Sequence, residues 1–157
     1  LIIIPRHTNR IEQIQNELIE LKLNFHIHSN KKVINKKTNI YIVDTYGETV
    51  PFFKICNVVF LGGSLINHGG QNPIEAARNG CKIIYGPNIR NFKEVYELLD
   101  KNKVSNKVRN EEQLVRKVNI LIKSNKISKK LENKINKLGK KILENVLSEF
   151  KVYLDKI

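Results

Sequence analysis

Four glycines and a carboxylate follow one apolar run of the sequence, in the stretch Phe60-Leu-Gly-Gly-Ser-Leu-Ile-Asn-His-Gly-Gly-Gln-Asn-Pro-Ile-Glu75. Glycine has no Cβ to block a close approach and adopts φ > 0 easily, so such a stretch can bring backbone N–H groups against a phosphate. Asn72, Pro73 and Glu75 have the spacing of a helix N-cap, a first helical residue and a capping-box partner. Because helix starts favour anions, the stretch predicts an anion site.

Short apolar runs that read as buried strands alternate with helical patterns. The predicted strands cover residues 1–4, 25–28, 40–43, 58–61 and 83–85, and the predicted helices cover 11–21, 48–55 and 73–79 and begin again at 91. Alternation with short connections predicts an α/β fold, a Rossmann-like doubly wound parallel sheet covered by helices.

Turn and cap residues support these boundaries. Thr8 and Asn9 are expected to cap the first helix, Asn91 and Glu94 to form a capping box, and Gly80 to end a helix in the left-handed conformation.

Polar residues stand where the predicted strands end. Besides the glycine stretch, these are Pro5-Arg6-His7, Asp44-Thr-Tyr-Gly-Glu48 and Gly86-Pro87. Since ligands of parallel α/β sheets bind at the carboxyl ends of the strands, we expect these segments to meet in one crevice.

The C-terminal part is helical and basic by its pattern. Residues 111–123 have helical spacing, and apolar residues from Ile127 to Leu154 recur every three or four positions, which predicts one long amphipathic helix or two that meet at Gly139. Residues 101–157 hold 16 of the 28 Lys and Arg but 6 of the 15 Asp and Glu. We interpret this charge first as a solvated helix face, with nucleic acid, anionic lipid or an acidic substrate as alternatives. Few aromatic residues interrupt it, which argues against stacking on single-stranded nucleic acid.

Several classes are excluded by what the sequence lacks. It has no nucleophile elbow, HExxH motif or P-loop, and its glycines lack the GxGxxG spacing of dinucleotide-binding folds. Cys56 and Cys81 stand in apolar segments without metal-ligand spacing, which predicts free thiols in a reducing compartment. At 157 residues the chain is expected to form one domain, residues 1–157, with 111–157 as a basic helical tail. Because it opens in mid-strand without Met, we interpret it as part of a longer protein.

Taken together, these motifs resemble a known family. Pro5-Arg6-His7, Asp44-Thr45 with Gly47-Glu48, Phe60-x-Gly-Gly-Ser-Leu65, Gly69-Gly70-x-Asn72-Pro73-x-Glu75, Gly86-Pro87 and Asn91-Phe-Lys-Glu94 resemble the C-terminal half of 3-deoxy-D-manno-octulosonic acid (Kdo) transferase over about residues 1–100. The resemblance implies a two-domain GT-B glycosyltransferase of lipopolysaccharide synthesis. This half would bind the donor CMP-Kdo, and an absent N-terminal half would bind the lipid A precursor.

The resemblance also implies roles for residues near the predicted strands 1–4 and 40–43. Arg6 would bind the donor phosphate or the Kdo carboxylate, the alternative being a surface ion pair. His7 would contact the same ligand or only form a turn. Gly47 and Glu48 would lie at the nucleotide base, although a Glu here also complements a helix dipole.

In the glycine stretch, the resemblance places Gly62, Gly63 and Ser64 near the donor or acceptor, the alternative being a sharp turn without a ligand. Gly69, Gly70 and Asn72 would present N–H groups to the CMP phosphate. Glu75 would hold the ribose hydroxyls or complete the capping box. The chain departs from the family at Asn67-His68, where Pro-Arg is usual, at Gln71 in place of His, and at Lys82 in place of Pro. A guanidinium is thereby lost, which weakens the expected hold on an anion unless His68 is protonated.

The implied reaction transfers Kdo with inversion and releases CMP, without metal or cofactor. No catalytic residue is expected in this chain, because the general base would lie in the absent half. This chain should therefore bind nucleotide without catalysing. It is expected to be soluble by itself and the full protein to act at the cytoplasmic face of the bacterial inner membrane. The alternatives are a GT-B transferase for another nucleotide sugar and a basic nucleic-acid-binding module.

Overall fold

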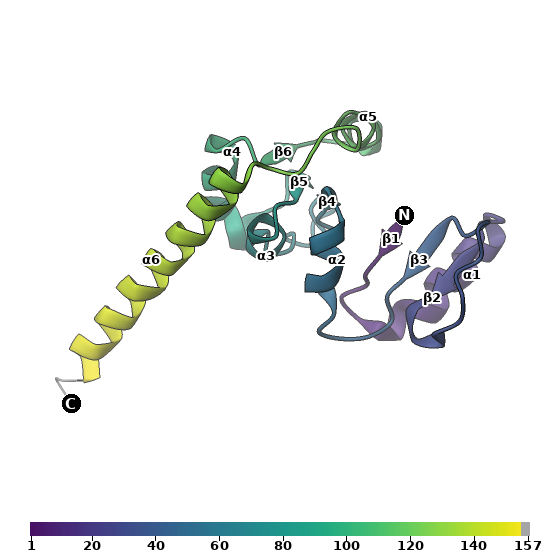
Figure 1. The fold of residues 1–157 in the computed structure, drawn as a ribbon, viewed down its shortest axis with the longest axis horizontal. Coiled ribbons are helices and arrows are strands. Elements are labelled where there is room, and N and C mark those ends of the chain that lie inside the picture. The colour runs from purple at the N-terminus through teal and green to yellow at the C-terminus, as the bar shows by residue number, and fades with distance from the viewer. Residues whose placement is uncertain (155–157) are drawn as a thin grey trace. The chain divides into compact units, whose positions relative to one another are not determined.

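The computed structural model describes residues 1–154, and within the last helix it describes the side chains of residues 129–137, 140, 144, 147 and 148. The chain divides into two compact units (Figure 1). Unit 1 is Leu1–Pro51, and unit 2 begins at Phe52.

Unit 1 is a small parallel sheet with one α-helix. Strands β1 (Ile2–Ile3), β2 (Phe25–Ile27) and β3 (Ile40–Ile42) lie in the order β1-β3-β2, all parallel. Leu18 of helix α1 (Ile11–Glu20) is buried with Ile40 and Ile42 of the central strand. The three predicted strands and this helix are confirmed.

The predicted caps of that helix are wrong. Thr8 and Asn9 lie in a 3₁₀ turn, η1 (Thr8–Arg10), and no side chain caps either η1 or α1. The Thr8 hydroxyl instead donates to the Tyr46 hydroxyl at 3.3 Å.

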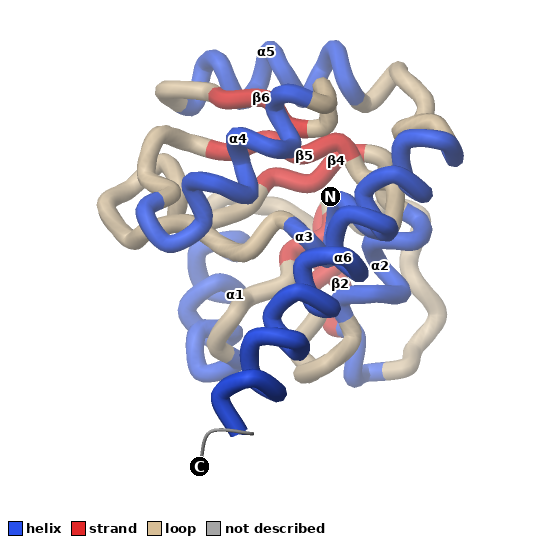
Figure 2. Tube along the Cα trace, turned by 90° about the vertical axis from the view of Figure 1, so that its left-hand side faces the viewer, coloured by secondary structure: helices blue, strands red, loops and turns tan. Residues whose placement is uncertain are grey.

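Unit 2 contains the second parallel sheet, in the order β4-β5-β6, drawn in red in Figure 2. Its strands are β4 (Val58–Phe60), β5 (Lys82–Tyr85) and β6 (Ser105–Lys107). The helices are α2 (Thr49–Ile55), which begins at the end of unit 1, α3 (Ile74–Arg78), α4 (Lys93–Lys101), α5 (Glu111–Leu121) and α6 (Lys129–Leu154), with a 3₁₀ turn η3 (Arg90–Phe92) before α4. The predicted α/β class with parallel strands is confirmed.

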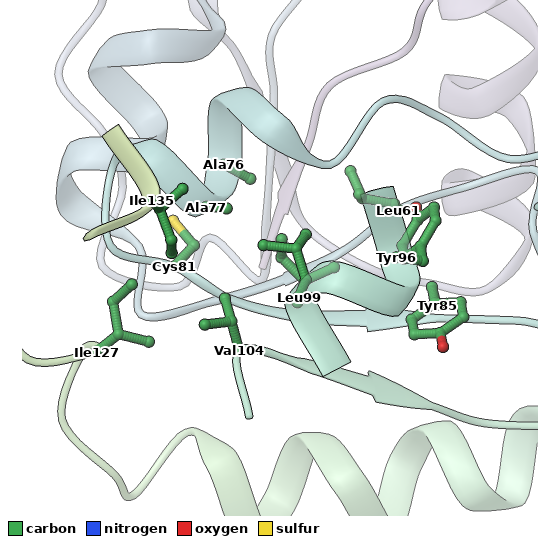
Figure 3. Packing of buried hydrophobic residues seen from close by; sticks show 11 residues of the cluster. Leu61, Ala76, Ala77, Cys81, Tyr85, Tyr96, Leu99, Val104, Ile127 and Ile135 are labelled. Carbon is green, nitrogen blue, oxygen red and sulfur yellow. The ribbon is translucent and has the colours of Figure 1, made fainter. Parts of the chain in front are cut away.

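The core of unit 2 gathers side chains from the sheet and from α3, α4 and α6 (Figure 3). The Tyr85 and Tyr96 rings lie 4.2 Å apart between their centroids. The buried members are Leu61, Ala76, Ala77, Cys81, Ile83, Tyr85, Tyr96, Leu99, Val104, Ile127 and Ile135.

A lysine joins two helix ends in this unit. The Lys126 ammonium donates to the carbonyls of Phe53 and Lys54 near the end of α2, each at 2.8 Å, and to that of Asn79 at 3.0 Å. Carbonyls in the last turn of a helix lack intrahelical partners, so a cation there is stabilising. Gly80 next to Asn79 has φ +81°, the left-handed helix end that the sequence predicts.

Two details differ from the sequence prediction. Strand β6 was not predicted, because Ser105, Asn106 and Lys107 are polar; only the buried residues on either side, Val104 and Val108, carry an apolar signal. The capping box at Asn91 is also wrong, since Asn91 lies in η3 and α4 begins at Lys93 with no capping side chain.

Helix α6 runs unbroken through Gly139, which is the first of the two alternatives that the sequence leaves open. Most of the predicted apolar stripe from Ile142 to Leu154 falls on side chains outside the described set. Within the described residues, no helix combines the length and apolarity that crossing a membrane requires.

Candidate functional site

The loop between β4 and α3 holds the glycines of the opening motif. Gly63, Gly69 and Gly70 have φ of +75°, +95° and +70°, which favour glycine because a Cβ is strained there. Gly69 and Gly70 are buried, yet their backbone N–H groups have no acceptor in the part of the chain that the structure describes. Buried amides are normally hydrogen-bonded, so this pair is suited to receive an anion.

Ser64 fastens this loop to the end of β5. Its hydroxyl donates to the Leu61 carbonyl at 2.6 Å and accepts from the Gly86 N–H at 2.8 Å, and its side chain is fully buried. A Cβ on Gly86 would lie 2.3 Å from the Ser64 carbonyl oxygen. Ser64 therefore shapes the loop, and its hydroxyl is not available to a ligand.

The residues after Gly86 continue this packing. The Asn88 N–H donates to the Ser64 carbonyl at 2.9 Å, and the Asn88 side chain donates to the same oxygen at 3.2 Å. A Cβ on Gly70 would meet the Asn88 carbonyl oxygen at 2.9 Å. The loops after β4 and β5 thus form one tightly packed surface, as expected from strands that end at the same edge of a sheet.

Tyr96 supports the glycine loop from inside the core. Its hydroxyl donates to the Gln71 carbonyl at 2.9 Å, and burial raises the pKa of this phenol well above its usual range. Burial, together with the hydrogen bond that its hydroxyl donates to Asp100 at 2.5 Å, also raises the pKa of Tyr85. Both phenols therefore stay neutral donors at physiological pH.

The loop ends in α3. The Asn72 side chain accepts from the Ile74 N–H at 3.0 Å. The N-cap of α3 is nevertheless Pro73 and no side chain caps it, so the predicted cap at Asn72 is wrong by one residue. Glu75 lies on the exposed side of the first turn. Gly62 is exposed, and a Cβ there would meet nothing within 4 Å.

In unit 1, the segments after β1 and β3 also meet. The backbone N–H and the hydroxyl of Thr8 both lie within hydrogen-bond range of the Tyr46 hydroxyl, at 3.5 and 3.3 Å. Arg6 and His7 are exposed just before this contact, and the structure shows no partner for either side chain among the described residues. Arg6 is therefore available to bind an anion.

Glu48, by contrast, is engaged within unit 1. Its carboxylate lies 2.8 Å from His28 Nε2 and accepts a hydrogen bond from the Thr45 hydroxyl. His28 Nδ1 is 2.7 Å from the Tyr41 hydroxyl. Gly47 before it has φ +79°. Glu48 is thus positioned by its neighbours at the start of α2.

Asp44 is also held by hydrogen bonds within unit 1, in its case from Ser29. Burial acts to raise the pKa of its carboxyl, but hydrogen bonds from the Ser29 hydroxyl and N–H outweigh burial, so the pKa lies below its usual value. The described residues contain no group of three or more His, Cys, Asp or Glu side chains placed to hold a metal ion.

Three residues near these loops were not predicted. His28 holds Glu48, Tyr96 holds Gln71, and Arg90 donates from its guanidinium to the Asn67 side chain at 2.5 Å. Arg90 follows Gly86-Pro87 at a strand end, where polar residues are candidates to contact a ligand. Nothing in the sequence around Tyr96 distinguishes it from an ordinary core residue.

Kdo transferases are among the known proteins that this chain resembles in sequence. A Kdo transferase from Rickettsia conorii is 30% identical over 158 residues, which is 96% of this chain and 34% of that protein. The Rickettsia prowazekii enzyme is 31% identical over 98% of this chain and 34% of its own length, and the Haemophilus influenzae enzyme is 32% identical over 63% and 23%. The chain thus spans about a third of the length of the Rickettsia relatives. No family model matches.

A solved structure shows the same fold. The C-terminal CMP-Kdo binding domain of WaaA from Acinetobacter baumannii superimposes with a TM-score of 0.76 at 24% identity, covering 87% of this chain and 71% of that one. The chain therefore has the α/β fold of a GT-B C-terminal domain. It is related to the Kdo transferases, as its motifs indicate.

Proposed function

We propose that this chain binds CMP-Kdo and serves as the donor-binding part of a Kdo transferase. The observation that carries the proposal is the pair of buried glycines, Gly69 and Gly70, whose N–H groups lack an acceptor among the described residues. Backbone amides that lie in a glycine loop at the edge of a parallel sheet are suited to a nucleotide phosphate. The similarity to Kdo transferases supports Kdo as the sugar of that donor.

In the proposed reaction, the bond between the anomeric carbon of Kdo and the CMP phosphate oxygen breaks as an acceptor hydroxyl attacks. Negative charge then grows on the departing CMP. The Gly69 and Gly70 amides stabilise that charge, since preorganised donors aimed at a developing charge lower the barrier. We propose that Arg6 also binds an anion of the donor and that no metal takes part.

The remaining parts of the proposal concern a longer protein. A general base outside this chain takes the proton of the acceptor hydroxyl, and the acceptor is a lipid A precursor. The protein acts at the cytoplasmic face of the bacterial inner membrane, where the basic residues 101–157 meet anionic lipid.

Nucleotide binding tests the proposal. Calorimetric titration of the chain with CMP, UDP and GDP should give clear binding for CMP and weak or no binding for the other two. Preference for UDP or GDP would indicate a transferase for another nucleotide sugar. Failure to bind any nucleotide would contradict the donor-binding role.

The Glu75→Ala variant tests the predicted ribose contact. Loss of a hydrogen bond to a carboxylate should weaken CMP binding by about 10-fold or more. Glu97→Ala is the matched control, because Glu97 is an exposed glutamate on α4. Equal CMP affinity in the two variants would remove the ribose role from Glu75 and leave it as a residue of the first helical turn.

A further inference from the structure

Arg90 places a positive charge against the glycine loop. It is the first residue of η3, and its Nη2 donates to Oδ1 of Asn67, 23 residues earlier in the chain, at 2.5 Å. The side chain is exposed, and none of the ion pairs found among the described residues includes it. Its charge is therefore not neutralised by a carboxylate in that part of the chain.

The backbone that carries Arg90 is fixed relative to the loop. Asn88, two residues earlier, donates its N–H to the Ser64 carbonyl at 2.9 Å. Asn91, one residue later, has its side-chain nitrogen 3.5 Å from where a Cβ on Gly69 would lie. Arg90 thus stands between two residues that contact the glycine loop, so its position follows that of the loop.

The loop has no permanent positive charge of its own. Residues 61–77 contain neither Lys nor Arg, and His68 is the one residue in that range that can gain a positive charge. Arginine stays protonated at all physiological pH values, and its planar guanidinium has five N–H donors that match the oxygens of phosphate or carboxylate. The bond to Asn67 uses one donor, which leaves others for a ligand.

We propose that Arg90 binds an anionic group of the nucleotide-sugar donor at the glycine loop, and that Asn67 holds the guanidinium in place. The ligand chemistry is a phosphate ester or a sugar carboxylate, next to the Gly69 and Gly70 amides. This inference rests on the proposed donor-binding function and deepens it. Arg90 thereby supplies the guanidinium that the loop sequence lacks.

The test compares Arg90→Gln with Arg78→Gln. Arg78 is a matched control because it is also exposed, also in unit 2, and also donates to an asparagine oxygen, that of Asn136 at 2.9 Å. Both variants lose one positive charge and one hydrogen bond to an amide. Arg90→Gln should weaken the binding of CMP-Kdo in calorimetry by about 10- to 100-fold, the range of hydrogen bonds to charged groups, whereas Arg78→Gln should change it less than 2-fold. The affinity of Arg90→Lys should lie between those of the unchanged chain and of Arg90→Gln, since lysine keeps the positive charge but lacks the planar set of guanidinium N–H donors.

Two further arms identify the anion and exclude a structural effect. Equal weakening for CMP and for freshly prepared CMP-Kdo assigns Arg90 to the phosphate, and weakening for CMP-Kdo alone assigns it to the sugar carboxylate. The binding of the unchanged chain should fall more steeply with salt than that of Arg90→Gln, while the circular dichroism spectra of the two stay the same. Asn67→Asp should also weaken binding, because the new carboxylate pairs with Arg90.

Equal affinities of Arg90→Gln and Arg78→Gln for both ligands, with CMP binding by the unchanged chain intact, would overturn the role of Arg90 alone. Absence of binding by the unchanged chain would overturn the proposed function together with it.

Discussion

Gly86→Ala adds a single methyl group and should nevertheless strongly lower the stability of the folded chain. A Cβ at this position would lie 2.3 Å from the Ser64 carbonyl oxygen, 2.5 Å from its carbon and 2.6 Å from the Leu65 nitrogen. All three are backbone atoms, so no side chain can turn away. To reach an ordinary contact of about 3.5 Å, the two segments must separate by about 1 Å.

That separation has a predictable cost. It stretches the bond from the Gly86 N–H to the Ser64 hydroxyl, now 2.8 Å, and that from the Asn88 N–H to the Ser64 carbonyl, now 2.9 Å. Overpacking of a well-packed site costs about 1–3 kcal/mol, and each weakened hydrogen bond about 1 kcal/mol. We expect Gly86→Ala to lower the free energy of unfolding by about 3 kcal/mol, and to weaken CMP binding because the glycine loop moves.

Gly62→Ala is the control, since the same methyl group is added in the same loop region. Neither glycine has a left-handed φ, and a Cβ on Gly62 would meet nothing within 4 Å. Urea unfolding followed by circular dichroism suits a chain without tryptophan. The midpoint should fall by about 1–2 M for Gly86→Ala and stay nearly constant for Gly62→Ala. Equal midpoints for both variants would refute the close contact between Gly86 and Ser64.

Three other predictions concern single residues of unit 2. Tyr96→Phe keeps the buried ring but removes the donor to the Gln71 carbonyl, so unfolding should become easier by about 1–3 kcal/mol in urea titrations; unchanged stability would mean that this hydrogen bond contributes nothing. Burial raises the pKa of the Cys81 thiol to about 11, so about a thousandth of this thiol is thiolate at pH 8. Iodoacetamide should therefore label the more exposed Cys56 first, as followed by peptide mass mapping. Faster labelling of Cys81 would contradict its burial. Gly139→Ala should stabilise α6 by about 1 kcal/mol, because a Cβ there meets nothing and alanine favours helix; a loss of helicity in circular dichroism would show that α6 is not continuous there.

The sequence predicts most of this fold because the signals are local. Each predicted strand is a short apolar run, and each is present within one or two residues of the expected bounds. Strand β6 escapes prediction since its own residues are polar, and its pairing with β5 is a long-range event. The caps at Asn9 and Asn91 are wrong because a 3₁₀ turn precedes each helix, which moves the helix start past the capping residue.

The site shows the same division between local and long-range information. Positive φ at Gly69 and Gly70 follows from residue type, as does the hydrogen bond that the Asn72 side chain accepts from the Ile74 N–H. What sequence spacing cannot show is that the Ser64 side chain turns inward to Gly86, or that Arg90 meets Asn67. Both contacts join loops more than 20 residues apart, so they depend on how the strands pair and not on any local pattern.

We propose above all that the Gly69 and Gly70 amides bind the phosphate of a cytidine nucleotide. A crystal structure of the chain with CMP tests it most directly. We expect phosphate density within hydrogen-bond distance of these two backbone nitrogens, with Glu75 near the ribose. Well-defined CMP bound elsewhere on the chain, with the two amides unoccupied, would contradict it.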